Sequence, residues 1–168
     1  MATIYPHRVL RVTERDGWVE LYITVDSGAI ETVIGPKQVP WDYQPSYGSV
    51  NGIMYEVANG TKIPNLGQQR MTLKTSEGKT RVITAQVCDV HKCLLSVSKL
   101  NYANQIVVLD GDESYIQDKT SGDKIKVDHK DRVYFLKAWV RATEDGVTLA
   151  LCEEQKAAAA SGFPGPAR

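Results

Sequence analysis

The chain of 168 residues lacks features that mark several large classes of protein. No apolar run approaches the ~20 residues that a membrane-spanning helix needs, and the N-terminal residues lack the apolar stretch of a signal peptide. The 20 Lys and Arg residues balance 20 Asp and Glu residues, so the formal net charge is zero. A dedicated nucleic-acid binder usually has an excess of basic charge. We therefore predict a soluble, cytoplasmic protein that binds neither nucleic acid nor a membrane through this segment.

Cysteine is also scarce, at three residues: Cys88, Cys93 and Cys152. This number is small and odd, which argues against a disulfide scaffold. Cys88, His91 and Cys93 lie close together in the sequence, whereas structural zinc sites usually take their cysteines as spaced pairs. We expect buried or half-buried free thiols, no bound metal and no cofactor.

Alternation of apolar and polar residues dominates the rest of the chain and predicts β-structure. Every second residue from Val19 to Val25 is apolar, so this segment is expected to form a half-buried strand that leads directly into Asp26. Residues 8–13 are its expected hairpin partner across the turn at Arg15-Asp16-Gly17. Further extended segments are predicted within 54–64, at 70–75 and at 80–90.

The fold class expected from this pattern is all-β with one short helix, at residues 94–104, capped by Ser96. After the helix, four short apolar segments alternate with turn residues, which predicts a β-meander extension over residues 106–140. The last segment, 141–168, is rich in Ala, Gly and Pro and is expected to be a largely disordered tail.

One loop has the residue types of a catalytic site: Val25-Asp26-Ser27-Gly28-Ala29. A strand delivers an acid onto a tight turn, and glycine lets the backbone approach a ligand closely. Trypsin-like serine proteases also contain Asp-Ser-Gly, but they place their histidine and orienting Asp upstream, and only His7 precedes Ser27 here. An ordinary hairpin turn uses the same residue types and is the other interpretation.

The segment Tyr22 to Ala29 resembles the aspartic-protease loop, hydrophobic-hydrophobic-Asp-(Ser/Thr)-Gly-(Ala/Ser). From residue 8 to residue 104, the order of expected elements resembles that of the retropepsins, the retroviral and retrotransposon aspartic proteases. Leu94-Leu95-Ser96-Val97-Ser98-Lys99-Leu100 is similar to a segment that follows the protease core in copia-type retrotransposon polyproteins. The resemblance implies a retropepsin-like acid-protease β-barrel over residues 1–105, from such a polyprotein or from a host protein derived from one.

This resemblance implies an aspartic endopeptidase that is active as a homodimer on an extended peptide or polyprotein. The chain has a single Asp-Ser-Gly and no room for a second lobe, so the partner carboxylate would come from a second copy of Asp26. The implied site residues are catalytic Asp26; Ser27, Gly28 and Ala29 of its loop; Val57, Ala58, Asn59 and Gly60 of the flap; and Leu94, Leu95 and Ser96 of a second hydrophobic loop.

The sequence departs from the family pattern at two places. Ser96 stands where the retroviral enzymes have glycine, and the flap lacks a glycine-rich tip. Hairpin symmetry favours Asn59-Gly60 as the tip, while spacing from Asp26 favours Asn51-Gly52; we place it at Asn59-Gly60. The alternative function is a non-catalytic dimerisation or binding module derived from a retroelement polyprotein.

Overall fold

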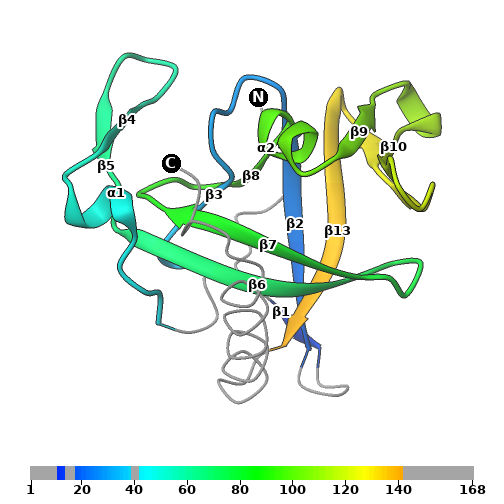
Figure 1. The fold of residues 1–168 in the computed structure, drawn as a ribbon, viewed down its shortest axis with the longest axis horizontal. Helices are drawn as coiled ribbons and strands as arrows, with labels where there is room; N and C mark the ends of the chain where they lie inside the picture. The colour runs from blue at the N-terminus through cyan, green and yellow to red at the C-terminus, as the bar shows by residue number, and fades with distance from the viewer. Residues whose placement is uncertain (1–10, 14–17, 39–41, 142–168) are drawn as a thin grey trace.

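The structure is a computed structural model that describes residues 11–13, 18–38 and 42–141 (Figure 1). The predicted turn at 15–17, Cys152 and residues 142–168 of the predicted tail lie outside the described residues. The strands are β1 (Arg11–Thr13), β2 (Trp18–Asp26), β3 (Val33–Ile34), β4 (Met54–Glu56), β5 (Lys62–Pro64), β6 (Gly67–Thr75), β7 (Thr80–Val87), β8 (Cys93–Ser96), β9 (Gln105–Val108), β10 (Tyr115–Asp118), β11 (Lys124–Lys126), β12 (Asp128–Lys130) and β13 (Val133–Arg141). The helices are α1 (Tyr47–Val50), α2 (Val97–Tyr102) and the 3₁₀ turn η1 (Gly111–Glu113).

Six strands form a closed barrel in the order β2-β8-β3-β7-β6-β13, and β13 closes it by pairing with β2. In Figure 1 the long β6–β7 hairpin crosses the upright pair of β2 and β13. β1 pairs with the other edge of β2, and β12 pairs with β13. The all-β prediction is confirmed, although the described residues contain a second short helix, α1, that the sequence did not suggest.

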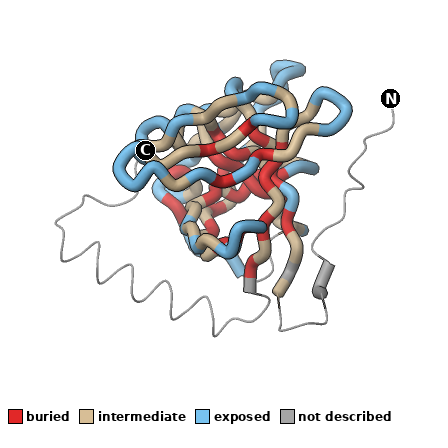
Figure 2. The backbone as a smooth tube through the Cα atoms, turned by 90° about the vertical axis from the view of Figure 1, so that its right-hand side faces the viewer, coloured by how far each residue is buried: buried red, intermediate tan, exposed pale blue. Residues whose placement is uncertain are grey.

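The core follows from the alternation of side chains along these strands. In β6, every second residue from Gly67 to Thr75 is buried while the residues between them are more exposed. Figure 2 shows the buried positions gathered inside the barrel and the exposed positions on the turns. The buried apolar cluster draws on all the barrel strands and includes Leu21, Ile23, Val25, Ile34, Met71, Leu73, Val87, Leu95, Leu136, Ala138 and Val140.

The segment expected to form a meander extension, 106–140, is divided between two sheets. β9, β10 and β11 form a separate three-stranded antiparallel sheet. In contrast, β13 pairs over seven residues with β2 and over three with β6, so it is a wall of the barrel. The boundary placed at residue 105 therefore does not separate a complete barrel from an extension, because the barrel needs β13 to close.

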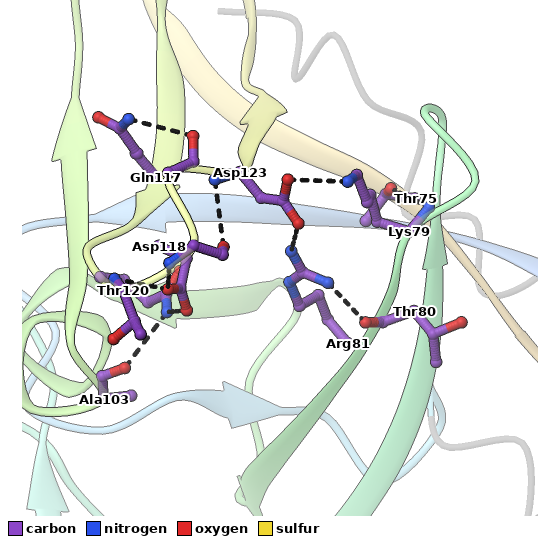
Figure 3. Close-up of polar contacts among 12 residues, drawn as sticks. Thr75, Lys79, Thr80, Arg81, Ala103, Gln117, Asp118, Thr120 and Asp123 are labelled. Atoms are coloured by element: carbon purple, nitrogen blue, oxygen red, sulfur yellow. Dashed lines mark hydrogen bonds and ion pairs between the residues drawn. The ribbon is translucent and has the colours of Figure 1, made fainter.

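Polar contacts attach the small sheet to the turn between β6 and β7 (Figure 3). The Asp123 carboxylate lies 3.0 Å from Lys79 Nζ and 3.8 Å from an Arg81 guanidinium nitrogen. The backbone N–H of Lys126 also donates to Glu77 Oε1 at 3.1 Å. The two sheets are thus joined by side chains at the end of the β6–β7 hairpin.

The helix predicted from Leu94 begins only at Val97, because the preceding residues Cys93–Ser96 form strand β8. β8 runs parallel to β2 and fills the place between β2 and β3 in the barrel. A short apolar run such as Leu94-Leu95 has no periodicity that separates a strand from a helix, so long-range pairing decides its structure.

No described helix is long and apolar enough to cross a membrane.

Candidate active site

Asp26 is the last residue of β2, and the chain turns at Ser27 and Gly28 directly after it. The Gly28 N–H donates to Asp26 Oδ1 at 2.7 Å, so the turn orients the carboxylate that it follows. A β carbon at position 28 would lie 3.3 Å from the same oxygen, which would crowd the carboxylate. The Asp26 side chain is partly exposed, whereas Val25 just before it is buried. The loop therefore presents one oriented carboxylate at the end of a rigid barrel strand.

Ser96, which is fully buried, holds the loop at its last residue, Ala29. Its hydroxyl donates to the Ala29 carbonyl at 2.7 Å, and its backbone N–H donates to Thr32 Oγ1 at 3.1 Å. The same hydroxyl accepts from the Lys99 N–H at 3.2 Å and so caps α2. The predicted capping role of Ser96 is confirmed, and the serine that departs from the retroviral pattern serves two hydrogen bonds here.

An ion pair adds a second connection between the loop and α2. Lys99 Nζ lies 2.9 Å from Glu31 Oε1, and both side chains are largely shielded from solvent. Together with the Ser96 contacts, this pair ties the segment 29–32 to the junction of β8 and α2. Neither Glu31 nor Lys99 was singled out from the sequence, because only the fold brings them together.

Residues 94–96, predicted as a second hydrophobic loop, are instead the end of strand β8, and the register places them beside the aspartate. Asp26 pairs with Ser96, Val25 with Leu95 and Thr24 with Leu94. Leu95 is buried in the barrel core, and Leu94 is half-buried. The structure thus brings together two of the predicted groups of site residues, the Asp26 loop and residues 94–96.

The β4–β5 hairpin contains the residues predicted for the flap. Val57 N–H donates to the Thr61 carbonyl at 2.9 Å, and Gly60 N–H donates to the Val57 carbonyl at 2.8 Å. Asn59 Oδ1 accepts from the Thr61 N–H, and Gly60 has a φ of 81°, which glycine adopts without strain. The turn of this hairpin is therefore at Asn59-Gly60, while Asn51 and Gly52 follow the end of α1. No hydrogen bond between described residues joins the hairpin tip, 57–60, to the loop 26–29.

Tyr55 in β4 lies half-buried at the root of the hairpin. Burial raises the pKa of the Tyr55 phenol, the hydrogen bond with Asn65 opposes this rise, and the Glu31 carboxylate adds a smaller increase. Tyr55 and its partner Asn65 have no motif around them, so the sequence held no signal for either.

The residues of the cysteine cluster, Cys88, His91 and Cys93, differ in burial. Cys88 and Cys93 are buried free thiols, as expected. Burial raises the pKa of each thiol from about 9 to about 12, so both are protonated and unreactive at neutral pH. His91 between them is exposed. In the part of the chain that the structure describes, no three His, Cys, Asp or Glu side chains gather into a metal site.

No family, no curated protein and no solved structure matches this chain.

Proposed function

We propose that the protein is an aspartic endopeptidase that is active as a homodimer and cleaves an extended peptide or polyprotein. The observation that carries the proposal is the Asp26 carboxylate at the end of a barrel strand, oriented by the Gly28 N–H at 2.7 Å and partly open to solvent. The resemblance of 22–29 to the aspartic-protease loop supports the same assignment. The proposed retropepsin-like family and retroelement origin rest on that resemblance.

The chemistry requires two carboxylates that face one water molecule. Two carboxylates in close contact share one proton, because like charges at short range do not both ionise. The ionised Asp26 takes a proton from the water as its oxygen attacks the peptide carbonyl carbon. The protonated Asp26 of the other copy donates its proton to the carbonyl oxygen, which gives a gem-diol. The first Asp26 then passes the proton taken from water to the amine nitrogen as the C–N bond breaks, and the other Asp26 takes back a proton from a gem-diol hydroxyl as the product carboxylic acid forms.

A second copy is needed because the chain has one Asp-Ser-Gly sequence. The neighbourhood of the loop is consistent with burial against a partner. Ser27 is exposed, and the side chain of Ile30, which follows the loop, is 79% exposed despite being apolar. By the family resemblance, Ser27 would hydrogen-bond across a twofold axis and hold the two aspartate loops coplanar.

The hairpin supplies a place for an extended substrate. Within the described residues, β4 and β5 pair only with each other, so each has a free edge. A free strand edge binds an extended peptide through main-chain hydrogen bonds, which suits a protease that acts on many side chains. In this proposal Val57, Ala58, Asn59 and Gly60 are the tip of a flap that covers the peptide.

To test this proposal, the purified chain is incubated with a longer precursor that contains its natural flanking sequences, with and without an aspartic-protease inhibitor, and cleavage of the precursor is measured. Asp26→Asn is nearly isosteric and should lower the cleavage rate by about a hundredfold or more while leaving the fold intact, because the general base is lost. Asp112→Asn, at an exposed position in η1, is the matched control and should cleave like the wild type.

Two results would contradict the proposal. Cleavage that Asp26→Asn retains would show that another residue does the chemistry. A wild-type chain that dimerises but never cleaves its precursor would favour the alternative function, a non-catalytic dimerisation or binding module.

A further inference from the structure

Asn65 lies directly after β5, at the root of the hairpin, and the residue is only 5% exposed. Its Oδ1 accepts from Ser46 Oγ at 2.8 Å and from the Gly67 N–H at 2.9 Å. Its Nδ2 donates to Tyr55 Oη at 3.0 Å and to Gln86 Oε1 at 2.8 Å. An asparagine amide has two donor hydrogens and two acceptor lone pairs, so every one of them is used.

Three of these four bonds connect Asn65 to three different elements of the fold. Ser46 caps α1, Tyr55 belongs to β4 of the hairpin, and Gln86 belongs to the barrel strand β7. Three backbone bonds complete the root. Ile53 N–H donates to the Gly48 carbonyl at 2.8 Å, Asn65 N–H donates to the Ile53 carbonyl at 3.0 Å, and Leu66 N–H donates to the Val87 carbonyl of β7 at 2.7 Å. In Figure 1 the hairpin projects from the barrel, and these hydrogen bonds hold its root.

Gln86 of β7, which bonds to Asn65, is also linked by hydrogen bonds to the aspartate loop. The Gln86 N–H donates to the Thr32 carbonyl at 2.8 Å. Thr32 Oγ1 in turn accepts from the Ser96 N–H, and Ser96 Oγ donates to the Ala29 carbonyl. The root of the hairpin and the Asp26 loop are thus hydrogen-bonded to neighbouring residues of the barrel.

We propose that Asn65 is a positioning residue that seats the β4–β5 hairpin on the barrel and fixes its orientation relative to the Asp26 loop. Asn65 touches neither the aspartate nor the hairpin tip, so it acts through Tyr55 and the root of the hairpin. The consequence for catalysis rests on the proposed peptidase function: a loosened hairpin weakens peptide binding and leaves the aspartates untouched.

Three variants probe the same contacts in different ways. Tyr55→Phe removes the hydroxyl through which Asn65 holds the hairpin, at a half-buried position where the ring is kept. Gly48→Ala would place a β carbon 2.5 Å from Asn65 Nδ2, which displaces the amide without removing any hydrogen-bonding group. Asn65→Ala removes all four bonds. Tyr102→Phe, at an 88% exposed position on α2, is the matched control.

The first measurement is amide hydrogen exchange, which requires no activity. In Tyr55→Phe and Gly48→Ala, the N–H groups of Ile53, Asn65 and Gly67 should exchange on the order of three- to tenfold faster, as expected for losing one hydrogen bond. Leu73, inside the β6–β7 ladder, and the control variant should be unchanged. Unchanged exchange at the root, or equal acceleration at Leu73, would overturn the proposal, since the latter indicates general destabilisation. If Asn65→Ala does not fold, the other two variants decide.

The second measurement separates binding from chemistry in the cleavage assay. Tyr55→Phe should raise KM for a peptide substrate on the order of three- to tenfold and leave kcat and its pH profile as in the wild type. A lower kcat at unchanged KM would overturn the positioning role. If the wild-type chain cleaves nothing, the proposed function fails, and the exchange measurement alone decides whether Asn65 seats the hairpin.

Discussion

Ser96 lies where β8, the aspartate loop and α2 meet, and its hydroxyl bonds to both the loop and the helix. It donates to Ala29 in the aspartate loop and accepts from Lys99 at the start of α2. A glycine here would leave the Ala29 carbonyl and the Lys99 N–H without this partner. The hydroxyl thus links the end of β8 to the neighbouring aspartate loop through the side chain.

This role predicts a specific loss of stability. Ser96→Ala should lower the free energy of unfolding by about 1–3 kcal/mol, because it removes a helix cap and a donor to a buried carbonyl. Urea denaturation measures the change. Ser98→Ala, at an exposed position in the same helix, should change stability by less than about 0.5 kcal/mol. Equal effects of the two substitutions would show that the Ser96 contacts contribute nothing particular.

Asp118 organises the turn after β10 in the same way that a cap organises a helix. Its Oδ1 accepts from the N–H groups of Thr120 and Ser121, each at 2.8 Å, and its Oδ2 accepts from Gln105 Nε2 at 2.8 Å. These bonds favour the ionised form, with the Ser121 N–H as the largest contribution, and lower the pKa of the carboxyl from 3.8 to about 2.

The sign of this shift gives a pH dependence. The Asp118 contribution to stability is fully present above about pH 4 and is lost as the pH falls toward 2, since only the ionised form accepts all three bonds. A carboxyl-carbon NMR titration should show a midpoint near 2. Gln105→Ala should raise that midpoint, whereas Gln117→Ala should not, because Gln117 donates to Gly122 instead. A midpoint near 3.8 in the folded protein would contradict the assigned hydrogen bonds.

At the scale of elements, local alternation predicted β2, β6 and β7 because each has one buried and one more exposed face. It failed at Cys93–Ser96, a short apolar strand that gains its partners from β2 and β3. The Asn-Gly hairpin was predictable because its turn is local. α1 was not, since its cap, Ser46, is held by Asn65, nineteen residues further along the chain.

β13 is the element whose role the sequence hid most completely. Its alternation indicated a strand, but nothing local reveals that its partners are β2 and β6, more than fifty residues away. The same holds for the Asn65 contacts and the Glu31–Lys99 ion pair, which depend on the closed barrel. Local patterns therefore predicted the Asp26 loop and the hairpin turn, but not the contacts that hold them in place.

Because β13 is a wall of the barrel, we predict that the residues before and after position 105 unfold as one cooperative unit. Leu136 is 5% exposed and pairs with Ile23 of β2. Leu136→Ala should lower the free energy of unfolding by about 2–5 kcal/mol, the usual cost of a cavity in a packed core. Leu109→Ala, at a 39% exposed position after β9, is the control and should cost much less.

Urea denaturation followed by tryptophan fluorescence and by far-UV circular dichroism would measure both variants. The two probes should report one coincident transition that shifts in Leu136→Ala. Two separate transitions, with only a minor one shifted, would show that the segment after residue 105 is an independent extension.

At the scale of the whole molecule, the proposed mechanism makes activity a property of the dimer, because each site takes one Asp26 from each copy. Wild-type chain and Asp26→Asn are mixed at constant total concentration, and subunit exchange is confirmed independently. With random assembly and inactive mixed dimers, activity follows the square of the wild-type fraction, so an equal mixture should retain about a quarter of the activity. A self-sufficient monomer would retain about half. A linear dependence after full exchange would reject the shared site even if the chain cleaves peptides, whereas a quadratic dependence would place both carboxylates on one twofold axis.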